Sequence, residues 1–362
     1  MRVGFDARMI THPGIGQYIK CLLPELARQA PGDEFILYGD PELLKDVATS
    51  ANTHIVRWSA PIYSVQEQLT FPYDRTDIDL VHVPHFNVPV FCRKKMVVTI
   101  HDLIYLLFPE SVPSPVARWY ARLVMGMALK KAAKIITVSE NTRNDLGKIF
   151  GKKYSEKIST IYEAAGKQFR RMEDKSMMEG VRGKYGLSDK IILYVGSVKP
   201  HKNISGLLKV YDKLREKGIT EQLVIAGRWD KKEDRLKNAI SGNESIKYLG
   251  EVPSNDLVAL YGLADVLVHL SLYEGFGLTV LEAMQCGTPA VVSETSSLQE
   301  VSGEAGLAVS PLNIGQIADT VYNVIINNEL RKGMIEAGLD RAKQFSWERA
   351  ARQTLEIYHN YE

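Results

Sequence analysis

The sequence has little cysteine. Cys21, Cys92 and Cys286 are the three cysteines among 362 residues, and none has the CxxC spacing of a metal or redox motif. An odd number of widely separated cysteines excludes a disulfide framework and a cysteine-based zinc site. We therefore expect a protein of a reducing compartment.

Excess charge and long apolar runs are also missing. Lys and Arg number 45 against 43 Asp and Glu, a net charge of +2, which excludes a protein whose main task is to neutralise nucleic-acid phosphates. No run of 18 apolar residues occurs, and the opening MRVGFDARMI has no apolar signal-peptide core. These absences predict a cytoplasmic protein that spans no membrane and binds no nucleic acid.

What is present is the pattern of an α/β protein. Short β-branched runs alternate with longer helical stretches, which predicts parallel sheets covered by helices, and 362 residues suffice for two domains. The first series of predicted strands comprises residues 3–6, 35–38, 54–58, 80–83, 96–100, 135–138 and 158–161. The second series comprises residues 191–195, 223–226, 246–249, 266–270, 290–292 and 307–309.

A polar stretch separates the two series. GKQFRRMEDKSMMEGVRGKYG has no strand signal and is typical of a linker or peripheral helix, so we place the boundary there. The predicted domains are residues 1–170 and 186–345, both Rossmann-like. A final helix over residues 346–362 is expected, with Ser346 as its N-cap.

The segment SLYEGFGLTVLEAMQCGTP holds the strongest cluster of candidate site residues. Gly275 and Gly277 permit close backbone approach, and a helix beginning near Leu278 would offer unpaired N–H groups to a phosphate. Glu274 and Glu282 can line one pocket, where carboxylates suit hydroxyls of a sugar and a ribose. The alternative is two solvated carboxylates beside glycines that only form a turn.

Within that segment, EGFGLTVLEAM resembles the Glu-x7-Glu signature of glycosyltransferase family 4, retaining GT-B enzymes that use nucleotide sugars. The order of the other motifs is similar over nearly the whole chain. The resemblance implies that Glu274 contacts hydroxyls of the donor sugar and Glu282 the ribose. It also implies that the backbone of Phe276, Gly277 and Leu278 approaches the sugar and diphosphate.

YVGSVKPHKN is the second candidate segment, where a strand ends at Gly196 and a helix begins near Asn203. A glycine turn followed by a lysine is typical of diphosphate binding. Lys202 is therefore the candidate phosphate ligand, and it resembles the family lysine that holds the diphosphate. An ordinary strand-to-helix turn is the alternative explanation of this segment.

This segment departs from the family pattern. Members commonly have an arginine where this sequence has Ser197 or His201. Either Lys199 or Arg228, in the later AGRWD turn, supplies the second positive charge, or the diphosphate is held more weakly.

Three further segments resemble parts of the family site. MVVTIHDLIYLLFPE places His101 just after a buried strand and resembles the family histidine beside the donor sugar; a histidine satisfied within the core is the alternative. HPGIGQYI resembles the glycine loop near the diphosphate and acceptor, through Gly14 and Gly16. Its third position is Ile19, so it does not fit a dinucleotide fingerprint. Val252 lies in a segment that resembles the backbone site of the nucleobase.

Residues 113–134 predict an amphipathic helix with five basic and no acidic residues. The basic residues are Arg118, Arg122, Lys130, Lys131 and Lys134. The apolar residues at helical spacing are Val116, Trp119, Tyr120, Leu123, Val124 and Met127. Such a helix fits an anionic lipid surface, and the alternative is a packed helix with a solvated basic end.

Together the motifs predict a retaining hexosyltransferase of polysaccharide biosynthesis. The resemblance implies two Rossmann-like domains facing across a cleft, with the helix 346–362 returning to the N-terminal one. The expected donor is GDP-mannose, by likeness to bacterial mannosyltransferases, and the acceptor a glycan or lipid-linked hydroxyl at the inner face of the membrane. No DxD-like metal motif is evident, so no cofactor or metal is expected. The alternatives are UDP-glucose or UDP-N-acetylglucosamine as donor, a GT-B epimerase, and a two-domain sugar-binding protein without catalysis.

Overall fold

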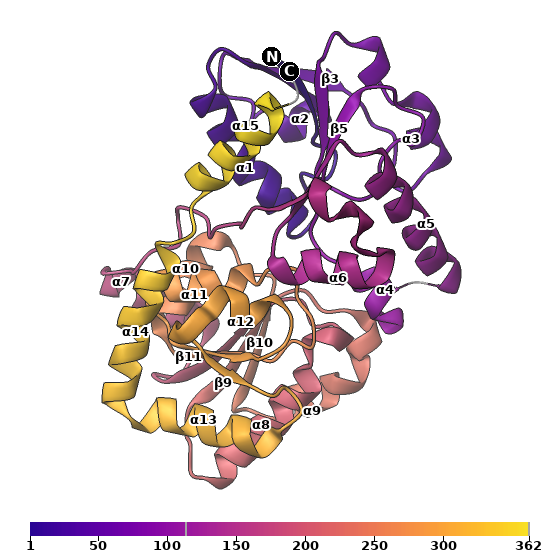
Figure 1. Ribbon diagram of the computed structural model, residues 1–362. Coiled ribbons are helices and arrows are strands. Elements are labelled where there is room, and N and C mark those ends of the chain that lie inside the picture. The colour runs from indigo at the N-terminus through magenta and orange to yellow at the C-terminus, as the bar shows by residue number, and fades with distance from the viewer. Residues whose placement is uncertain (113, 361–362) are drawn as a thin grey trace. The chain divides into compact units, whose positions relative to one another are not determined.

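The computed structural model describes residues 1–112 and 114–360. It divides into two compact units (Figure 1). The first contains Met1–Glu163 and the C-terminal residues from Ser346, and the second contains Ala164–Phe345. The predicted helices over 113–134 and 346–362 extend onto residues 113 and 361–362, which lie outside the described residues.

A parallel seven-stranded sheet forms the centre of the first unit, in the order β3-β2-β1-β4-β5-β6-β7. Its strands are β1 (Arg2–Asp6), β2 (Glu34–Gly39), β3 (Thr53–Arg57), β4 (Leu80–Val83), β5 (Lys95–Ile100), β6 (Lys134–Thr137) and β7 (Ile158–Thr160). Its α-helices are α1 (Ile15–Gln29), α2 (Pro41–Leu44), α3 (Val65–Thr70), α4 (Ile104–Leu107), α5 (Pro115–Lys131), α6 (Glu140–Phe150) and α15 (Trp347–His359). The strand order reverses between β1 and β4, which is where open α/β sheets form ligand pockets.

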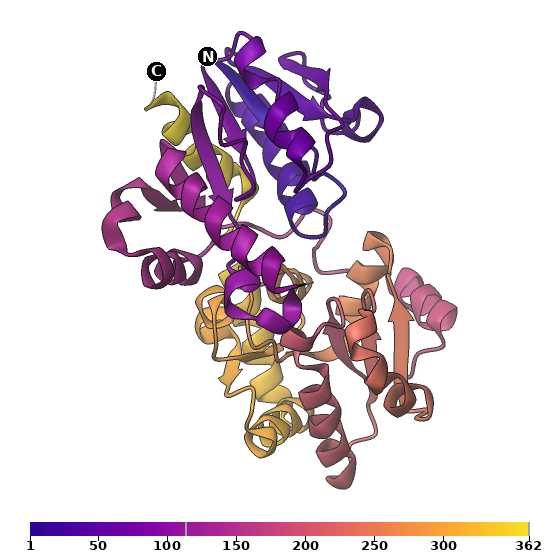
Figure 2. The ribbon, with the colours of Figure 1, turned by 90° about the vertical axis from the view of Figure 1, so that its right-hand side faces the viewer.

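The helix α15 belongs to the first unit although it is the last element of the chain. In both views its yellow ribbon lies with the indigo-to-magenta first unit (Figures 1 and 2). It begins as expected at Ser346, whose side chain accepts a hydrogen bond from the backbone N–H of Arg349. It packs on α1, and the Tyr358 hydroxyl lies 2.5 Å from Nδ1 of the buried His82. The sheet core of this unit is therefore completed by the C-terminal helix.

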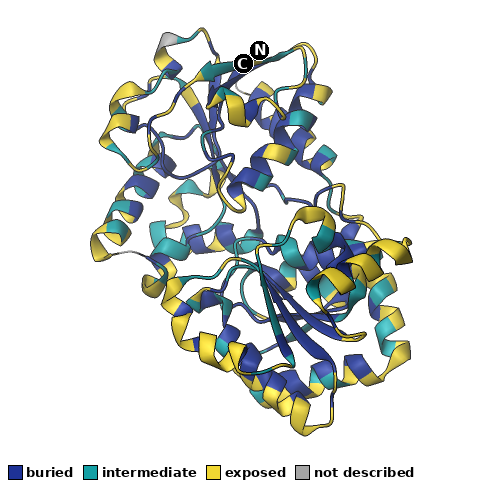
Figure 3. Cartoon of the chain, turned by 180° about the vertical axis from the view of Figure 1, so that it is seen from behind, coloured by how far each residue is buried: buried dark blue, intermediate teal, exposed yellow. Residues whose placement is uncertain are grey.

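The second unit holds a parallel six-stranded sheet in the order β10-β9-β8-β11-β12-β13. Its strands are β8 (Ile191–Val195), β9 (Gln222–Ala226), β10 (Ile246–Gly250), β11 (Ala264–His269), β12 (Ala290–Ser293) and β13 (Leu307–Val309). Its α-helices are α7 (Lys175–Tyr185), α8 (Ile204–Glu216), α9 (Lys237–Ser241), α10 (Ser254–Leu263), α11 (Leu278–Cys286), α12 (Ser297–Ser302), α13 (Ile314–Ile326) and α14 (Asn328–Ala342). The inner strands of this sheet are mostly buried between helices (Figure 3), whereas the edge strands β10 and β13 are mostly half-buried.

The predicted strands are confirmed, each within two residues of its observed ends. They form two consecutive parallel sheets, as the alternating pattern predicts. The polar stretch between the two series contains α7, which packs against α10. Of the two expected structures, a linker or a peripheral helix, the peripheral helix is therefore observed.

The apolar residues predicted on one face of helix α5 are partly buried in the core and partly exposed to solvent. Val124 lies in the core, and Tyr120 and Met127 are partly buried against it. Val116, Trp119 and Leu123 point to solvent, with 74%, 65% and 45% of their surface exposed. The helix is therefore a packed element and still presents an apolar strip outside.

Candidate active site

The carboxyl end of β11 leads through a tight loop into α11. Gly277 is the residue before this helix and has a φ of +109°, which disfavours any side chain. A Cβ at this position would also lie 2.8 Å from Cδ2 of Leu298. The helix thus begins at Leu278 as predicted, and the close packing explains the glycine without any ligand.

Glu274 lies in that loop, and three donors converge on one of its oxygens. Oε1 lies 2.5 Å from Nζ of Lys202, 2.7 Å from Nε2 of His269 and 2.7 Å from Oγ of Ser271. Burial by itself would raise the pKa of Glu274, but the charge of Lys202 and the hydrogen bond from His269 outweigh it and hold that pKa well below its usual range. The site therefore contains a fixed, ionised carboxylate beside an ammonium.

Glu282 lies one to two turns into α11 and is only 8% exposed. The hydroxyl of Tyr261 donates a hydrogen bond to its Oε2 at 2.8 Å. Burial raises the pKa of Glu282 to about 7, and the Tyr261 bond opposes this effect. In contrast to Glu274, the Glu282 carboxylate forms no ion pair with a positively charged side chain in the described part of the chain.

The turn after β8 presents Lys202 just before α8. Asn203 is the N-cap of that helix with a φ of +56°, and its side chain accepts from the N–H of Gly206. His201, one of the two positions where the family has an arginine, is buried. Burial and the neighbouring Lys202 lower the pKa of His201 to about 3. His201 is therefore neutral at neutral pH and cannot supply the second positive charge.

The other arginine position, Ser197, lies beside the turn that contains Arg228. A parallel bridge pairs Val198 with Trp229, and the N–H of Val198 donates to the carbonyl of Arg228 at 2.8 Å. The two turns touch closely, because a Cβ on Gly227 would lie 2.0 Å from the carbonyl oxygen of Gly196. Arg228 thus occupies the register position next to Ser197, and its side chain is exposed.

In the first unit, His101 follows β5 with both ring nitrogens engaged. Nδ1 lies 3.0 Å from Oε1 of Glu163, and Nε2 lies 3.1 Å from the carbonyl oxygen of Pro84. Both partners are acceptors, so both bonds form only when the ring has two N–H groups. Asp102 accepts from the N–H of Ile104, whereas Glu163 is the carboxylate that orients the imidazole.

Gly14 is the N-cap residue of α1, Gly16 lies in the first turn of that helix, and Val252 lies on a loop. Gly14 precedes α1 with a φ of +80°, and a Cβ on Gly16 would lie 2.3 Å from the carbonyl oxygen of Ile10. Val252 is half-buried between β10 and α10. Local backbone geometry therefore explains both glycines, and their roles toward a ligand stay predictions.

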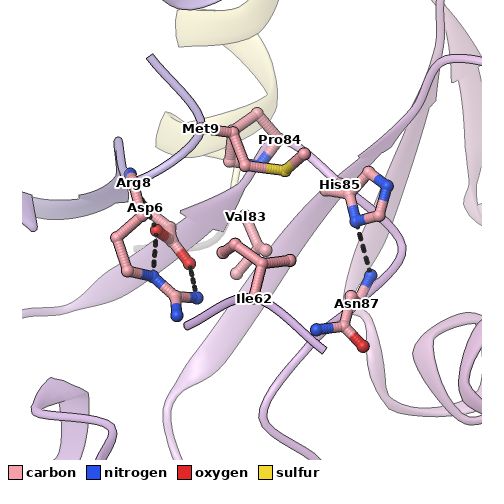
Figure 4. A pocket seen from close by; sticks show the side chains of 8 residues that line it. All are labelled: Asp6, Arg8, Met9, Ile62, Val83, Pro84, His85 and Asn87. Atoms are coloured by element: carbon pink, nitrogen blue, oxygen red, sulfur yellow. Dashed lines mark hydrogen bonds and ion pairs between the residues drawn. The ribbon is translucent and has the colours of Figure 1, made fainter. Parts of the chain in front are cut away.

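A small pocket lies at the strand-order reversal of the first unit (Figure 4). Its lining residues are Asp6, Arg8, Met9, Ile62, Val83, Pro84, His85 and Asn87. Arg8 lies 2.6 Å from carboxylate oxygens of both Asp6 and Glu67, and the N–H of Asn87 donates to Nδ1 of His85. The contacts of Arg8 with Asp6 and of Asn87 with His85 are local, whereas the contact of Arg8 with Glu67 joins residues 59 positions apart, which no local motif could predict.

The described residues contain neither a metal-binding cluster nor a membrane-spanning helix. Within residues 1–112 and 114–360 no group of three or more His, Cys, Asp or Glu side chains is placed to hold a metal ion. No helix in this part of the chain is long and apolar enough to cross a membrane.

Known proteins resemble the chain throughout its length. The family model described as Glycosyltransferase Family 4 matches residues 14–164, and the one described as Glycosyl transferases group 1 matches residues 181–341. O-antigen chain mannosyltransferase B of Escherichia coli is 34% identical over 284 residues, which cover 77% of this chain and 74% of that protein.

Two solved structures have a similar fold. Sucrose-phosphate synthase of Thermosynechococcus elongatus superposes with a TM-score of 0.80 at 21% identity, over 99% of this chain and 98% of that one. HepE of Anabaena, solved with UDP and glucose, has a TM-score of 0.78 at 18% identity, over 99% and 100%. The predicted GT-B fold class is confirmed.

Proposed function

Because the chain belongs to glycosyltransferase family 4, the glycosyl transferases group 1, and is a glycosyltransferase, we propose that it transfers mannose from GDP-mannose to a hydroxyl acceptor with retention of configuration. The similarity to an O-antigen chain mannosyltransferase supports mannose and a glycan or lipid-linked acceptor. UDP-glucose or UDP-N-acetylglucosamine is the second candidate donor, because HepE was solved with UDP and glucose.

The observation that best supports this function is the contact between Glu274 and Lys202. An ionised carboxylate accepts hydrogen bonds from sugar hydroxyls, and an ammonium 2.5 Å away attracts the diphosphate of the same donor. Both halves of a nucleotide sugar therefore find partners at neighbouring atoms. Glu282 offers a second buried carboxylate for the ribose hydroxyls.

The proposed reaction replaces one bond at the anomeric carbon by another on the same face. The bond to the diphosphate oxygen breaks through an oxocarbenium-like state, the bond to the acceptor oxygen forms, and the departing diphosphate takes the acceptor's proton. Negative charge develops on the diphosphate. Lys202, Arg228 and the N–H groups at the start of α11 stabilise this charge, so we propose that no metal ion is required.

Product analysis with radiolabelled donors tests the function. Purified protein is given GDP-mannose, UDP-glucose or UDP-N-acetylglucosamine, with methyl α-mannoside and a polyprenyl-diphosphate-linked sugar as acceptors. We expect an α-mannoside from GDP-mannose, formed equally with EDTA present. Transfer from a UDP-sugar instead would refute the proposed donor. A product with inverted configuration would refute the proposed mechanism, and the absence of any transfer would refute the proposed function.

Lys202→Ala is the matching variant, with Lys209→Ala on the exposed side of α8 as its control. Removing a charge that stabilises the transition state costs about 10²–10³ in rate at comparable sites. We therefore expect kcat to fall by that factor for Lys202→Ala and to stay within twofold for the control. Equal rates of the two variants would remove Lys202 from the mechanism.

We also propose that the protein works in the cytoplasm and that its first unit docks on the anionic inner face of the membrane through α5. The exposed strip of Val116, Trp119 and Leu123 fits the acyl boundary, and the exposed Arg122 and Lys130 fit anionic headgroups. Each basic residue near such a surface contributes about 1 kcal/mol. A lipid-linked acceptor would then be held where the enzyme binds.

Co-sedimentation with phosphatidylglycerol vesicles tests the docking. We expect salt-sensitive binding that is lost in a Trp119→Ser, Leu123→Ser variant and weakened in an Arg122→Gln, Lys130→Gln variant. Leu312→Ser, which removes a side chain 76% exposed in the second unit, is the matched control and should bind normally. Wild-type protein that ignores these vesicles at low salt would refute the proposal.

A further inference from the structure

His269 is a buried histidine at the end of β11 that no motif singled out. It is 1% exposed, and its ring stacks on Tyr194 with centroids 5.6 Å apart and planes 10° apart. Its Nε2 lies 2.7 Å from Oε1 of Glu274. Because the carboxylate oxygen can only accept, Nε2 is the donor in this contact.

The contacts of Glu274 are one-sided. Lys202, His269 and Ser271 all bond to Oε1, whereas no hydrogen bond to Oε2 is found within the described residues. His269 and Ser271 hold the carboxylate from the end of a buried strand, which has few degrees of freedom. Lys202 holds it with a flexible side chain whose ammonium is also suited to a diphosphate.

We propose that His269 is a positioning residue for Glu274. It fixes Oε1 so that Oε2 is free to accept a hydroxyl of the donor hexose, and it keeps the carboxylate in place when Lys202 contacts the diphosphate. Without His269, the hydroxyl of Ser271 is the remaining fixed donor to Oε1. This inference rests on the proposed function, because it assumes that the hexose of a nucleotide sugar meets Glu274.

Two substitutions separate the hydrogen bond from the packing. His269→Phe keeps an aromatic ring against Tyr194 but removes the donor. His269→Gln loses the ring but places an amide N–H near the position of Nε2. A packing role predicts that the phenylalanine variant resembles the wild type, whereas a positioning role predicts that the glutamine variant does.

The measurement is calorimetric binding of a nucleoside diphosphate and of its hexose conjugate, together with kcat. The pair is GDP and GDP-mannose, or the corresponding pair for whichever donor the wild type uses. The conjugate reports the contact with Glu274, and the nucleoside diphosphate reports the rest of the site. For His269→Phe we expect the affinity for the nucleoside diphosphate to stay unchanged and the affinity for the hexose conjugate to fall toward that of the nucleoside diphosphate. We expect kcat to fall by about 10- to 100-fold, the range of one hydrogen bond to a charged group. For His269→Gln we expect kcat within about threefold of the wild type.

Each outcome decides the proposal. His269→Phe with wild-type kcat, or with equal losses for both ligands, refutes it. If His269→Phe does not fold, the test is the ratio of the affinities of folded His269→Gln for the two ligands. A ratio equal to that of the wild type supports the proposal, and a changed ratio refutes it. A wild type that transfers no sugar from any donor refutes the proposed function instead, so the two failures are distinguishable.

Discussion

Replacing Glu282 by glutamine should make the second unit more stable at alkaline pH while weakening nucleotide binding. The side chain is buried, and burial raises its pKa to about 7. Glutamine has the same shape and still offers an oxygen to the Tyr261 hydroxyl, which now bonds to Oε2 at 2.8 Å. The substitution therefore removes a buried charge without removing the hydrogen bond.

The size of the effect follows from proton linkage. The unfolded chain has the ordinary glutamate pKa of about 4.5, so between pH 4.5 and 7 the folded protein binds more protons. Its stability therefore falls as pH rises through this window and is constant above it. The gap between 4.5 and about 7, at roughly 1.36 kcal/mol for each pH unit, corresponds to about 3 kcal/mol. Glu282→Gln lacks this penalty.

Urea unfolding at pH 5, 6, 7 and 8 measures the difference. We expect the free energy of unfolding of Glu282→Gln, minus that of the wild type, to grow by roughly 2–3 kcal/mol from pH 5 to pH 8, because this range covers most of the window. Glu336→Gln, an exposed change on α14, should show no such trend. Nucleoside diphosphate affinity should fall only in Glu282→Gln. A difference in stability that is the same at pH 5 and pH 8 would show that Glu282 is ionised throughout and would refute the reasoning.

Four further substitutions test the local geometry, each by urea unfolding. Gly227→Ala has no room for a Cβ and should destabilise the second unit by about 2 kcal/mol or more, whereas Gly218→Ala, at a positive φ in open space, should cost less. Ser346→Ala removes the N-cap of α15 and should cost about 1 kcal/mol. Glu163→Gln removes a charged partner of His101 and should cost about 1–3 kcal/mol; an unchanged transition would show that the charge of Glu163 does not stabilise the fold.

The strands and helix starts could be predicted from the sequence because their signals are local. Buried parallel strands are continuous β-branched runs, such as Ile191–Val195, and caps such as Ser346 stand next to the helices they begin. Glu274 and Lys202 were predicted from separate motifs, and the structure places them 2.5 Å apart.

The partners of the site residues could not be predicted in the same way. Glu163 contacts His101 from 62 residues away, and Tyr261 contacts Glu282 from a different helix. Such contacts depend on strand order and not on spacing along the chain. Helix α5 shows a related limit, because helical spacing grouped the buried Val124 with the exposed Trp119.

The return of α15 to the first unit constrains the order in which the protein is synthesised and folds. The chain leaves the first unit at Glu163 and re-enters it at Ser346, so the second unit is an insertion within the first. Translation delivers β1 before the second unit and α15 after it, and α15 contains Tyr358, whose hydroxyl is a hydrogen-bond partner of the buried His82. A nascent first unit therefore stays incomplete while the whole of the second unit emerges from the ribosome and folds. Its core closes only after α15 has been synthesised, so a chain that is stalled or truncated before α15 exposes the α1 surface that α15 normally covers.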